Sequence, residues 1–464
     1  MTEQLSILLE RIDGLMNRID YLESEVSRLN TENKLLMGQV DGLTKRLSKY
    51  ETPKNSQNSS RPPSSDFPKL QKTQSLREPS LKKPGGQLGH EGSTLRMVTT
   101  PNIIEQHTPF YCICCGEDLS AQQSCFAGKR QVIDLPLIVP NVVEHQLFDK
   151  RCKCGHLNKA SYPIGVTAPV SYGENVQALI AYLSARQYIP IKRLSEFMSD
   201  MFGLSVSTGG IDYILNKMTK KASVIYESIR QDVLKNTIIG ADETGVNINS
   251  KNNWAWTFQY DRATFIAIHP NRGSKAIDEI MPEGLQNNIL VTDCWSSYFK
   301  TNAASHQLCT AHLLRELTFL KEKYKNDTWT TRMSGLITNA LCLRRENNTT
   351  KTKVEQILNS FSDLTIEPIC QENKEVIVFQ KRMVKYADYV FNFLQNKDIP
   401  PDNNGSERAI RNFKVKLKVS GFFKSFAGAM TYATIRSVID TAIKNSQNPF
   451  EIIKLLAQCE VATE

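Results

Sequence analysis

Three acidic residues stand where a protein could bind divalent cations. They are Asp242 in the predicted strand IIGAD, Asp293 in the predicted strand NILVTD and Glu407 in the predicted helix SERAIRNF. We expect both aspartates to end their strands and Asn404 to cap the helix. An acid at the C-terminal end of a buried strand faces the crevice in which α/β proteins bind ligands, and carboxylates bind hard divalent cations. Each acid also fits an ordinary surface carboxylate, and Glu407 could serve only the helix dipole.

Two cysteine pairs indicate a second kind of metal site. The pairs are Cys112-x-x-Cys115 and Cys152-x-Cys154, and a glycine follows each pair. Four thiolates on two tight turns form the closed tetrahedral set of a structural Zn²⁺ site. The C-x-C spacing of the second pair weakens the match. A redox role is disfavoured, because the C-x-x-C does not open a helix after a strand.

Basic residues are concentrated after Glu407. The segment 408–424 contains no acid and six cations, namely Arg408, Arg411, Lys414, Lys416, Lys418 and Lys424. Within KVKLKV the lysines alternate with apolar residues, which predicts a strand with one cationic face. Such a face, interleaved with phenylalanines, suits a nucleic-acid backbone, although lysines also protect solvated edge strands. His312, about one turn into the predicted helix CTAHLLREL, could contact a phosphate, stabilise a leaving group or simply pack in the fold.

A heptad pattern occupies the first fifty residues. Apolar residues alternate at intervals of three and four, and the d positions are mostly Leu. The a positions are Leu5, Ile12, Ile19, Val26, Asn33, Val40 and Leu47. β-branched residues at a with Leu at d favour a parallel two-stranded coiled coil, and one Asn at a fixes its register. We therefore expect a homodimer. The alternative is an amphipathic helix that packs on its own domain.

Two further segments could contact DNA. The stretch after residue 50 is rich in Pro, Ser and Lys, so it is predicted to be a flexible linker whose Lys82 and Lys83 follow DNA phosphates or are simply solvated. The runs IKRLSEFMSDMF and TGGIDYILNKM, joined by GLSVS, have the outline of a helix-turn-helix. Its second helix would present Thr208, Asn216 and Lys217 outward. Such helix pairs are also common as packing units.

The length, composition and charge of the chain limit the classes of protein to which it can belong. The 464 residues suggest about three structural units. With 40% hydrophobic and 23% charged residues the chain is globular, which excludes wholesale disorder. The net charge of 57 − 48 = +9 favours a polyanionic partner. We see neither an apolar run near the ~18 residues of a membrane span nor a secretory signal, so we expect a cytoplasmic protein whose eleven cysteines are thiols or metal ligands.

The order of these motifs resembles transposases of the bacterial insertion sequence sixty-six family. The resemblance runs nearly from end to end. It includes the heptad start, KKPGGQLGHEGSTL, CICCGEDL, RCKCGH, GADETGVNI, VTDCWSSY, CTAHLLREL and PDNNGSERAIRNFKV. Two departures stand out. Cys294 and Trp295 follow the second aspartate where Gly and Tyr are expected, and Phe422 and Phe423 replace a more tryptophan-rich stretch. We expect neither departure to touch the acids.

The resemblance implies a ribonuclease-H-like catalytic fold with a DDE triad. The matching positions are Asp242, Asp293 and Glu407, separated by 293 − 242 = 51 and 407 − 293 = 114 residues. These carboxylates would hold two Mg²⁺ or Mn²⁺ ions per active site. The implied reaction is metal-dependent DNA cleavage and strand transfer by in-line phosphoryl transfer. Implied partners are the element's terminal inverted repeats, target DNA and accessory proteins encoded by the element, with no membrane.

The fold class that we expect is multidomain, mixed α and β. The expected units are a coiled-coil dimerisation helix (1–50), a flexible basic linker (51–99), a β-rich zinc-binding domain (100–166), a helical helix-turn-helix-like segment (167–235), a ribonuclease-H-like DDE domain (236–430) with a helical insertion at about 325–400, and C-terminal helices (431–464). Two other functions stay open: a nuclease or resolvase of the same fold that cuts without joining, and a non-catalytic DNA-binding regulator. An interaction protein organised by the coiled coil fits the strand-end acids less well.

Overall fold

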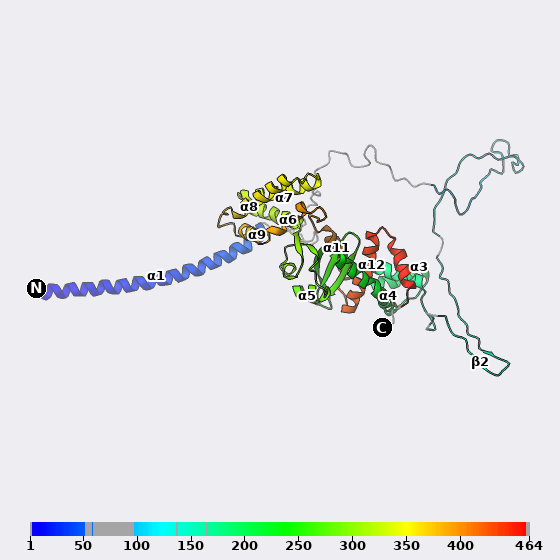
Figure 1. Ribbon diagram of the computed structural model, residues 1–464, viewed down its shortest axis with the longest axis horizontal. Helices are drawn as coiled ribbons and strands as arrows, with labels where there is room; N and C mark the ends of the chain where they lie inside the picture. The colour runs from blue at the N-terminus through cyan, green and yellow to red at the C-terminus, as the bar shows by residue number, and fades with distance from the viewer. Residues whose placement is uncertain are drawn as a thin grey trace.

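The computed structural model describes residues 2–51, 58, 97–135, 138–163, 166 and 168–460. Most of the predicted linker, including Lys82 and Lys83, lies outside these described residues. Helix α1 (Thr2–Glu51) extends away from the rest of the chain as one continuous helix (Figure 1). Its described apolar side chains are exposed; Leu15, Val26 and Val40 are 56–61% accessible. The predicted N-terminal helix is therefore confirmed, and its apolar stripe faces solvent.

The segment 97–166 contains much less strand than the predicted β-rich domain. Only β1 (Lys150–Arg151) and β2 (Leu157–Asn158) pair as strands in its described part, with an isolated bridge between Tyr111 and Asp118. The other extended stretches have no neighbouring strand with which to exchange backbone hydrogen bonds. The β-rich expectation was therefore too strong for this segment.

Three helices follow, as the sequence predicted. They are α2 (Glu174–Ala185), α3 (Ile191–Phe202) and α4 (Thr208–Lys235). Gly203 ends α3 with a positive φ of 64°, and the Ser207 side chain caps α4 by accepting a hydrogen bond from the Gly210 N–H. Thr208 is exposed, but Asn216 and Lys217 are only partly so, and Asn216 accepts a hydrogen bond from the Thr431 hydroxyl. The expectation that all three residues point outward was wrong for Asn216.

A five-stranded mixed sheet forms the centre of the molecule. Its strands are β3 (Ile238–Ile248), β4 (Lys251–Gln259), β5 (Thr264–His269), β6 (Ile289–Thr292) and β7 (Ser305–Leu308), in the order β5-β4-β3-β6-β7. The first three pair antiparallel, and β6 and β7 pair parallel to β3 and to each other. The predicted mixed sheet is confirmed. Strand β7 was not predicted, because its run SHQL lacks an apolar pattern.

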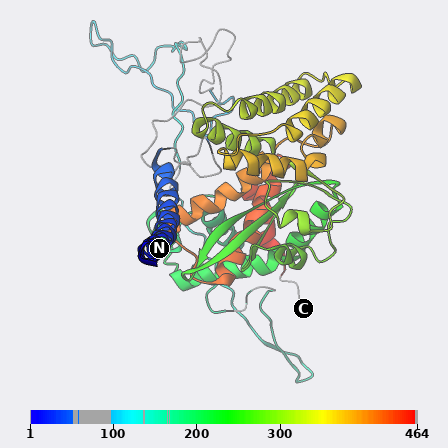
Figure 2. The same cartoon turned by 90° about the vertical axis from the view of Figure 1, so that its left-hand side faces the viewer.

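The helical insertion packs around a second apolar core. Helix α6 (Thr310–Lys323) precedes the predicted insertion, whose helices are α7 (Thr328–Arg345), α8 (Lys351–Ile366), α9 (Lys374–Lys385) and α10 (Asn392–Gln395). Trp329, Phe361 and Phe379 are among its buried residues. Figure 2 shows these yellow and orange helices gathered at one end of the sheet. Helix α5 (Ser274–Ile280) lies between β5 and β6 in the sequence.

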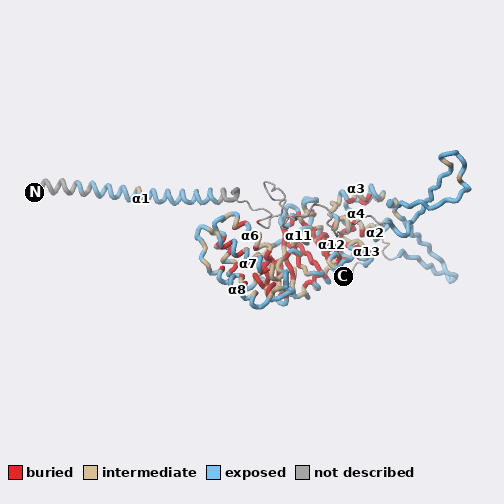
Figure 3. Tube along the Cα trace, turned by 90° about the horizontal axis from the view of Figure 1, so that it is seen from above, coloured by how far each residue is buried: buried red, intermediate tan, exposed pale blue. Residues whose placement is uncertain are grey.

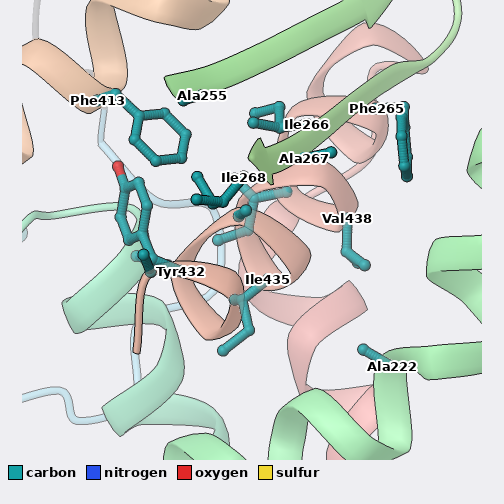
Figure 4. Close-up of a cluster of buried hydrophobic side chains, with 14 of the residues drawn as sticks. Ala222, Ala255, Phe265, Ile266, Ala267, Ile268, Phe413, Tyr432, Ile435 and Val438 are labelled. Atoms are coloured by element: carbon teal, nitrogen blue, oxygen red, sulfur yellow. The ribbon is translucent and has the colours of Figure 1, made fainter. Parts of the chain in front are cut away.

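The last helices close the main core. They are α11 (Asn404–Ser420), α12 (Phe426–Lys444) and α13 (Pro449–Gln458). Phe413 of α11 and Tyr432 of α12 meet with ring centroids 4.8 Å apart, beside Ile266 and Ile268 of β5 (Figure 4). Buried residues are concentrated in this body, whereas the described side chains of α1 are almost all exposed (Figure 3). Among the described residues, no helix is long and apolar enough to cross a membrane.

The predicted strand KVKLKV is a helix. Residues 414–419 belong to α11, whose buried positions include Ala409, Ile410, Phe413 and Lys416. These positions recur at intervals of three or one, which follows the helical period. The alternation of lysines with apolar residues over six positions is typical of a strand. The buried positions of the whole segment 404–420 follow a helical period, and the segment forms a helix.

Candidate active site

Two of the three predicted acids come from neighbouring strands at the centre of the sheet. Asp242 lies in the middle of the eleven-residue β3, so the expectation that it ends a strand was wrong. The parallel pairing of β3 with β6 extends only to Gly240 opposite Val291, and Asp293 directly follows β6. Asp242 therefore lies just beyond the paired stretch. Parallel strands place both acids at the same edge of their shared ladder.

Helix α11 brings the third acid onto this edge. Its N-cap is Asn403, not the predicted Asn404, and Glu407 lies in its first turn. The Asn403 amide donates a hydrogen bond of 2.7 Å to the Ala241 carbonyl, directly before Asp242. Ser406 in turn donates to Asn403 Oδ1 at 2.7 Å. The start of α11 is therefore fixed to the strand that carries Asp242.

Glycines allow this close approach. A Cβ at Gly240 would lie 2.6 Å from Asn403 Oδ1 and 2.9 Å from Ser406 Oγ, and a Cβ at Gly405 would lie 2.6 Å from Gln259 Nε2. Real Cβ atoms are not found at such distances. A side chain at Gly240 would displace Asn403 and Ser406 at the start of α11, whereas one at Gly405 would displace the end of the Gln259 side chain.

The acids are close enough to change each other's ionisation. Burial first, and then the carboxylates of Glu243, Asp293 and Glu407, raise the pKa of Asp242 well above its ordinary value. Burial and Glu243 also raise the pKa of Asp293, against the opposing effects of the Trp295 N–H, His312 and Arg272. An excess of buried negative charge is what a bound divalent cation would offset. The residues present therefore fit a cation site.

The carboxylate oxygens of Asp242, Asp293 and Glu407 do not all lie within 4.8 Å of one another in this structure. Within the part of the chain that the structure describes, only one cluster of metal-ligating types has its ligand atoms within 4.8 Å of one another, and it contains Cys309, His312 and Glu407. Glu407 thus lies between the two aspartates of the sheet and the residues Cys309 and His312 at the start of α6.

Helix α6 places an arginine and a histidine beside Glu407. Arg315 donates to Glu407 Oε1 at 2.7 Å, and His312 Nδ1 lies 3.6 Å from the same oxygen. Burial and then Arg315 lower the pKa of His312. Sequence reasoning placed His312 near this site but missed Arg315. The signal was available, because residues three apart in CTAHLLREL share one helix face.

A second buried acid was also missed. The Glu243 side chain is only 1% exposed; it accepts from Arg272 at 2.8 Å and from the Tyr298 hydroxyl. Arg272 lies over the rings of Trp254 and Trp295, at 4.7 and 4.0 Å. Side chains alternate along β3, so Glu243 points away from the Asp242 side chain and forms an ion pair with Arg272. The charge of Glu243 nevertheless still raises the pKa of Asp242.

The residue after Cys294 does touch the acids. The Trp295 backbone N–H donates to Asp293 Oδ1 at 2.8 Å, so the expectation of no contact was wrong. This bond favours the ionised carboxylate. Trp295 therefore supports Asp293 through its backbone and Arg272 through its ring.

The basic segment is divided between surface and core. Arg408, Arg411, Lys418 and Lys424 are exposed and Lys414 is half-buried. Lys416 is buried, and its ammonium lies 3.3 Å from the carbonyl oxygens of Ser184 and Ile189. Burial lowers the pKa of Lys416 to about 8. Lys416 therefore holds α11 to the α2–α3 connection, and its predicted contact with phosphate finds no support in this position.

The predicted zinc ligands form two separate turns. Gly116 donates to the Cys112 carbonyl and Gly155 to the Cys152 carbonyl, both at 2.9 Å, and both glycines have positive φ. Backbone N–H groups of Cys115 and Cys154 lower the pKa of Cys112 and Cys152 respectively. Among the described residues, no three of the four cysteines gather as metal ligands. The structure forms each pair but does not bring the pairs together.

Comparison with known families identifies the chain. The model described as "Transposase IS66 family" matches residues 169–431, and one described as "Family of unknown function (DUF6444)" matches residues 7–96. The search of curated proteins found no match. The first match spans 431 − 169 + 1 = 263 of the 464 residues and includes Asp242, Asp293 and Glu407. Because the match covers more than half of the chain, the chain belongs to the IS66 family of transposases.

Proposed function

We propose that this chain is a DDE-type transposase that cuts DNA at the ends of its element and joins the freed 3′ ends to target DNA. Asp242, Asp293 and Glu407 are its catalytic acids. The observation that carries the proposal is that three separate elements bring these acids to one edge of the sheet. Asp293 follows β6, which pairs parallel to β3, and the Asn403 amide fixes the start of α11, which carries Glu407, to Ala241 directly before Asp242. The strand order β5-β4-β3-β6-β7, with its antiparallel and parallel halves, supports a ribonuclease-H-like fold.

The three acids would hold two Mg²⁺ or Mn²⁺ ions. Bound ions of this class lower the pKa of an attacking hydroxyl and stabilise a leaving oxygen in phosphoryl transfer. The protein's own residues keep the carboxylates in place. The Trp295 N–H orients Asp293, the Asn403 amide fixes the strand at Ala241, and Arg315 holds Glu407.

The surface of α11 supports a DNA path next to the acids. Arg408, Arg411 and Lys418 are exposed and recur at intervals of three and seven, so they share one face of the helix that begins near Glu407. Arginine and lysine on such a face bind phosphates without regard to sequence. Lys424 and the first residues of α4 would extend this contact, and terminal repeats and target DNA are the proposed ligands.

The remaining units would organise the protein around DNA. We propose that α1 pairs with a second copy as a parallel coiled coil, since its apolar stripe is exposed. We also propose a structural Zn²⁺ ion for Cys112, Cys115, Cys152 and Cys154, because each pair already forms a turn of the kind that points thiolates at one ion. The two turns must approach each other for this, and binding of the ion would order the segment.

A cleavage assay tests the proposal. Purified protein is incubated with DNA that carries the flanks of its own coding region, in Mg²⁺ or in EDTA. Asp242→Asn, Asp293→Asn and Glu407→Gln should each reduce cleavage and joining at least about 10²-fold, the effect of losing one charge-stabilising group, and should leave DNA binding intact.

Matched controls are Asp363→Asn and Glu355→Gln, two exposed acids of α8. They should behave as wild type. Wild-type strand transfer by Glu407→Gln would refute the triad. Nicked products without joined strands would instead indicate a nuclease of the same fold.

A further inference from the structure

We propose that Cys309, His312 and Glu407 form a second cation site, selective for a thiophilic divalent ion such as Zn²⁺. We further propose that an ion bound there withdraws Glu407 from the aspartates. The second statement rests on the proposed role of Glu407 in the DDE triad; the first does not.

The geometry of the three ligand atoms carries the proposal. Cys309 directly precedes α6 and His312 lies in its first turn, so both side chains are presented by one turn of backbone, and Glu407 arrives from α11. Sulfur, nitrogen and oxygen atoms of the three residues lie within 4.8 Å of one another. His312 Nδ1 is 3.6 Å from Glu407 Oε1. Two ligands on one tetrahedral Zn²⁺ are separated by roughly 3.4 Å, so only small movements are needed.

An unsatisfied polar atom points to a ligand. Among the described residues, the buried His312 Nδ1 has no hydrogen-bond partner. A bound ion would satisfy this nitrogen, which a well-packed protein rarely leaves unpaired. The Asn403 N–H already donates to Cys309 Sγ at 3.2 Å, a bond that would stabilise a metal-bound thiolate. The thiol proton is released to solvent when the metal–sulfur bond forms.

The donor types decide which ion is favoured. One sulfur, one nitrogen and one oxygen suit Zn²⁺ and similar borderline ions, whereas Mg²⁺ prefers oxygen ligands only. Asp242 and Asp293 offer oxygen alone. Two neighbouring sites of different preference therefore share Glu407, and an ion in one competes for the carboxylate that the other needs.

Arg315 opposes the ion. Its guanidinium donates to Glu407 Oε1 at 2.7 Å, so a cation must displace it or take the second carboxylate oxygen. Removing this positive charge should therefore tighten the binding of the ion. A merely structural ion pair would show no such effect on metal affinity.

The first experiment measures Zn²⁺ binding to the full chain by equilibrium dialysis, without Mg²⁺ or DNA. Wild type should bind one Zn²⁺ per chain more than Cys309→Ser or His312→Gln, both checked for folding by circular dichroism. Arg315→Ala should bind this ion at least about tenfold more tightly, which corresponds to about 1.4 kcal/mol. Cys342→Ser, a half-buried thiol of α7, should match wild type. Equal Zn²⁺ binding by wild type, Cys309→Ser and His312→Gln would overturn the site.

The second experiment measures Mn²⁺ binding by electron paramagnetic resonance, with and without Zn²⁺. The Mn²⁺ affinity of each protein is compared with and without Zn²⁺. Zn²⁺ should lower this affinity at least about tenfold in wild type but not in Cys309→Ser. Unchanged Mn²⁺ affinity in zinc-loaded wild type would overturn the withdrawal of Glu407 and leave the zinc site standing. Neither measurement needs DNA cleavage, so failure of the transposase proposal would be visible separately.

Discussion

At the scale of single residues, the site combines acids that repel one another with neighbours that hold them in place. Asp242 has a raised pKa because it is buried near Glu243, Asp293 and Glu407. Glu243 forms an ion pair with Arg272, and Glu407 with Arg315. Charge repulsion of this kind destabilises the metal-free fold, a common property of functional sites.

Neutralising Asp242 should therefore stabilise the metal-free protein. A raised folded-state pKa means that the folded chain binds the proton more tightly than the unfolded chain does. The associated stability is present at low pH and is lost as the pH rises from the ordinary pKa of 3.8 through the raised one. At neutral pH in EDTA, Asp242→Asn should raise the melting temperature by roughly 2–4 °C for each kcal/mol recovered.

Differential scanning calorimetry across pH measures this effect. The difference between Asp242→Asn and wild type should shrink as the pH falls, and Asp363→Asn should show none of it. A variant that melts below wild type at neutral pH in EDTA would contradict the prediction.

At the scale of elements, the start of α11 is fixed directly on β3 and β4. Gly240 and Gly405 leave room for Gln259, Asn403 and Ser406 between helix and sheet. The α11 segment also contacts α6, because the Thr310 N–H and hydroxyl both donate to the Pro401 carbonyl. The position of Glu407 is thus determined by contacts from three sides.

Gly240→Ala should displace α11 and with it Glu407. We expect a loss of about 1–3 kcal/mol in the free energy of unfolding, the usual effect of overpacking, and a loss of cleavage with DNA binding retained. Gly335→Ala in α7 is the matched control, since its Cβ would meet nothing within 4 Å and alanine favours a helix. Denaturant unfolding and the cleavage assay check both variants. Full activity in Gly240→Ala would show that α11 does not set the site.

Two lysines of α11 should behave differently although they are two residues apart. Lys418 is exposed, so Lys418→Ala should weaken DNA binding and reduce the slope of log K against log salt by about 1. Lys416 is buried, so Lys416→Ala should lower stability and leave that slope unchanged. Fluorescence anisotropy at several salt concentrations separates the two. An equal change of this slope in both variants would show that Lys416 contacts DNA.

At the scale of the whole molecule, the described residues form two apolar cores, and the described side chains of the long helix α1 join neither of them (Figure 3). The main core unites α2–α4, strands β3–β6, α5 and α11–α13, and the second combines residues of α6–α10 with Leu308 of β7. The apolar face of α1 is complementary to another copy of itself, because its a and d residues form one stripe.

A charge in this stripe should separate the dimer. Val26 occupies an a position and is 56% exposed in the single chain. Val26→Glu should shift the protein from dimer to monomer in sedimentation equilibrium, since two glutamates would face each other in the seam. Ser24→Glu, on the outer face of the same turn, should remain dimeric. A monomeric wild type would contradict the coiled-coil proposal.

The sequence alone determined those features that depend on local periodicity. The intervals of three and four predicted α1, and the runs before and after GLSVS predicted α3 and α4. The sequence also indicated that Asp242 lies in a strand, Asp293 at the end of a strand and Glu407 in a helix. The family resemblance is confirmed by the match over residues 169–431. The role of the acids stays a prediction.

Only the tertiary structure decided which residues meet. Pairing of β3 with β6 left Asp242 in mid-strand beside Asp293. Packing against α2 and the α2–α3 connection buried Lys416, although its run of residues reads locally as a cationic strand. Arg315 was brought to Glu407, and Arg272 to Glu243, across 92 and 29 residues. Local pattern carries no information about such contacts, because they arise from burial and charge between segments that are distant in the chain.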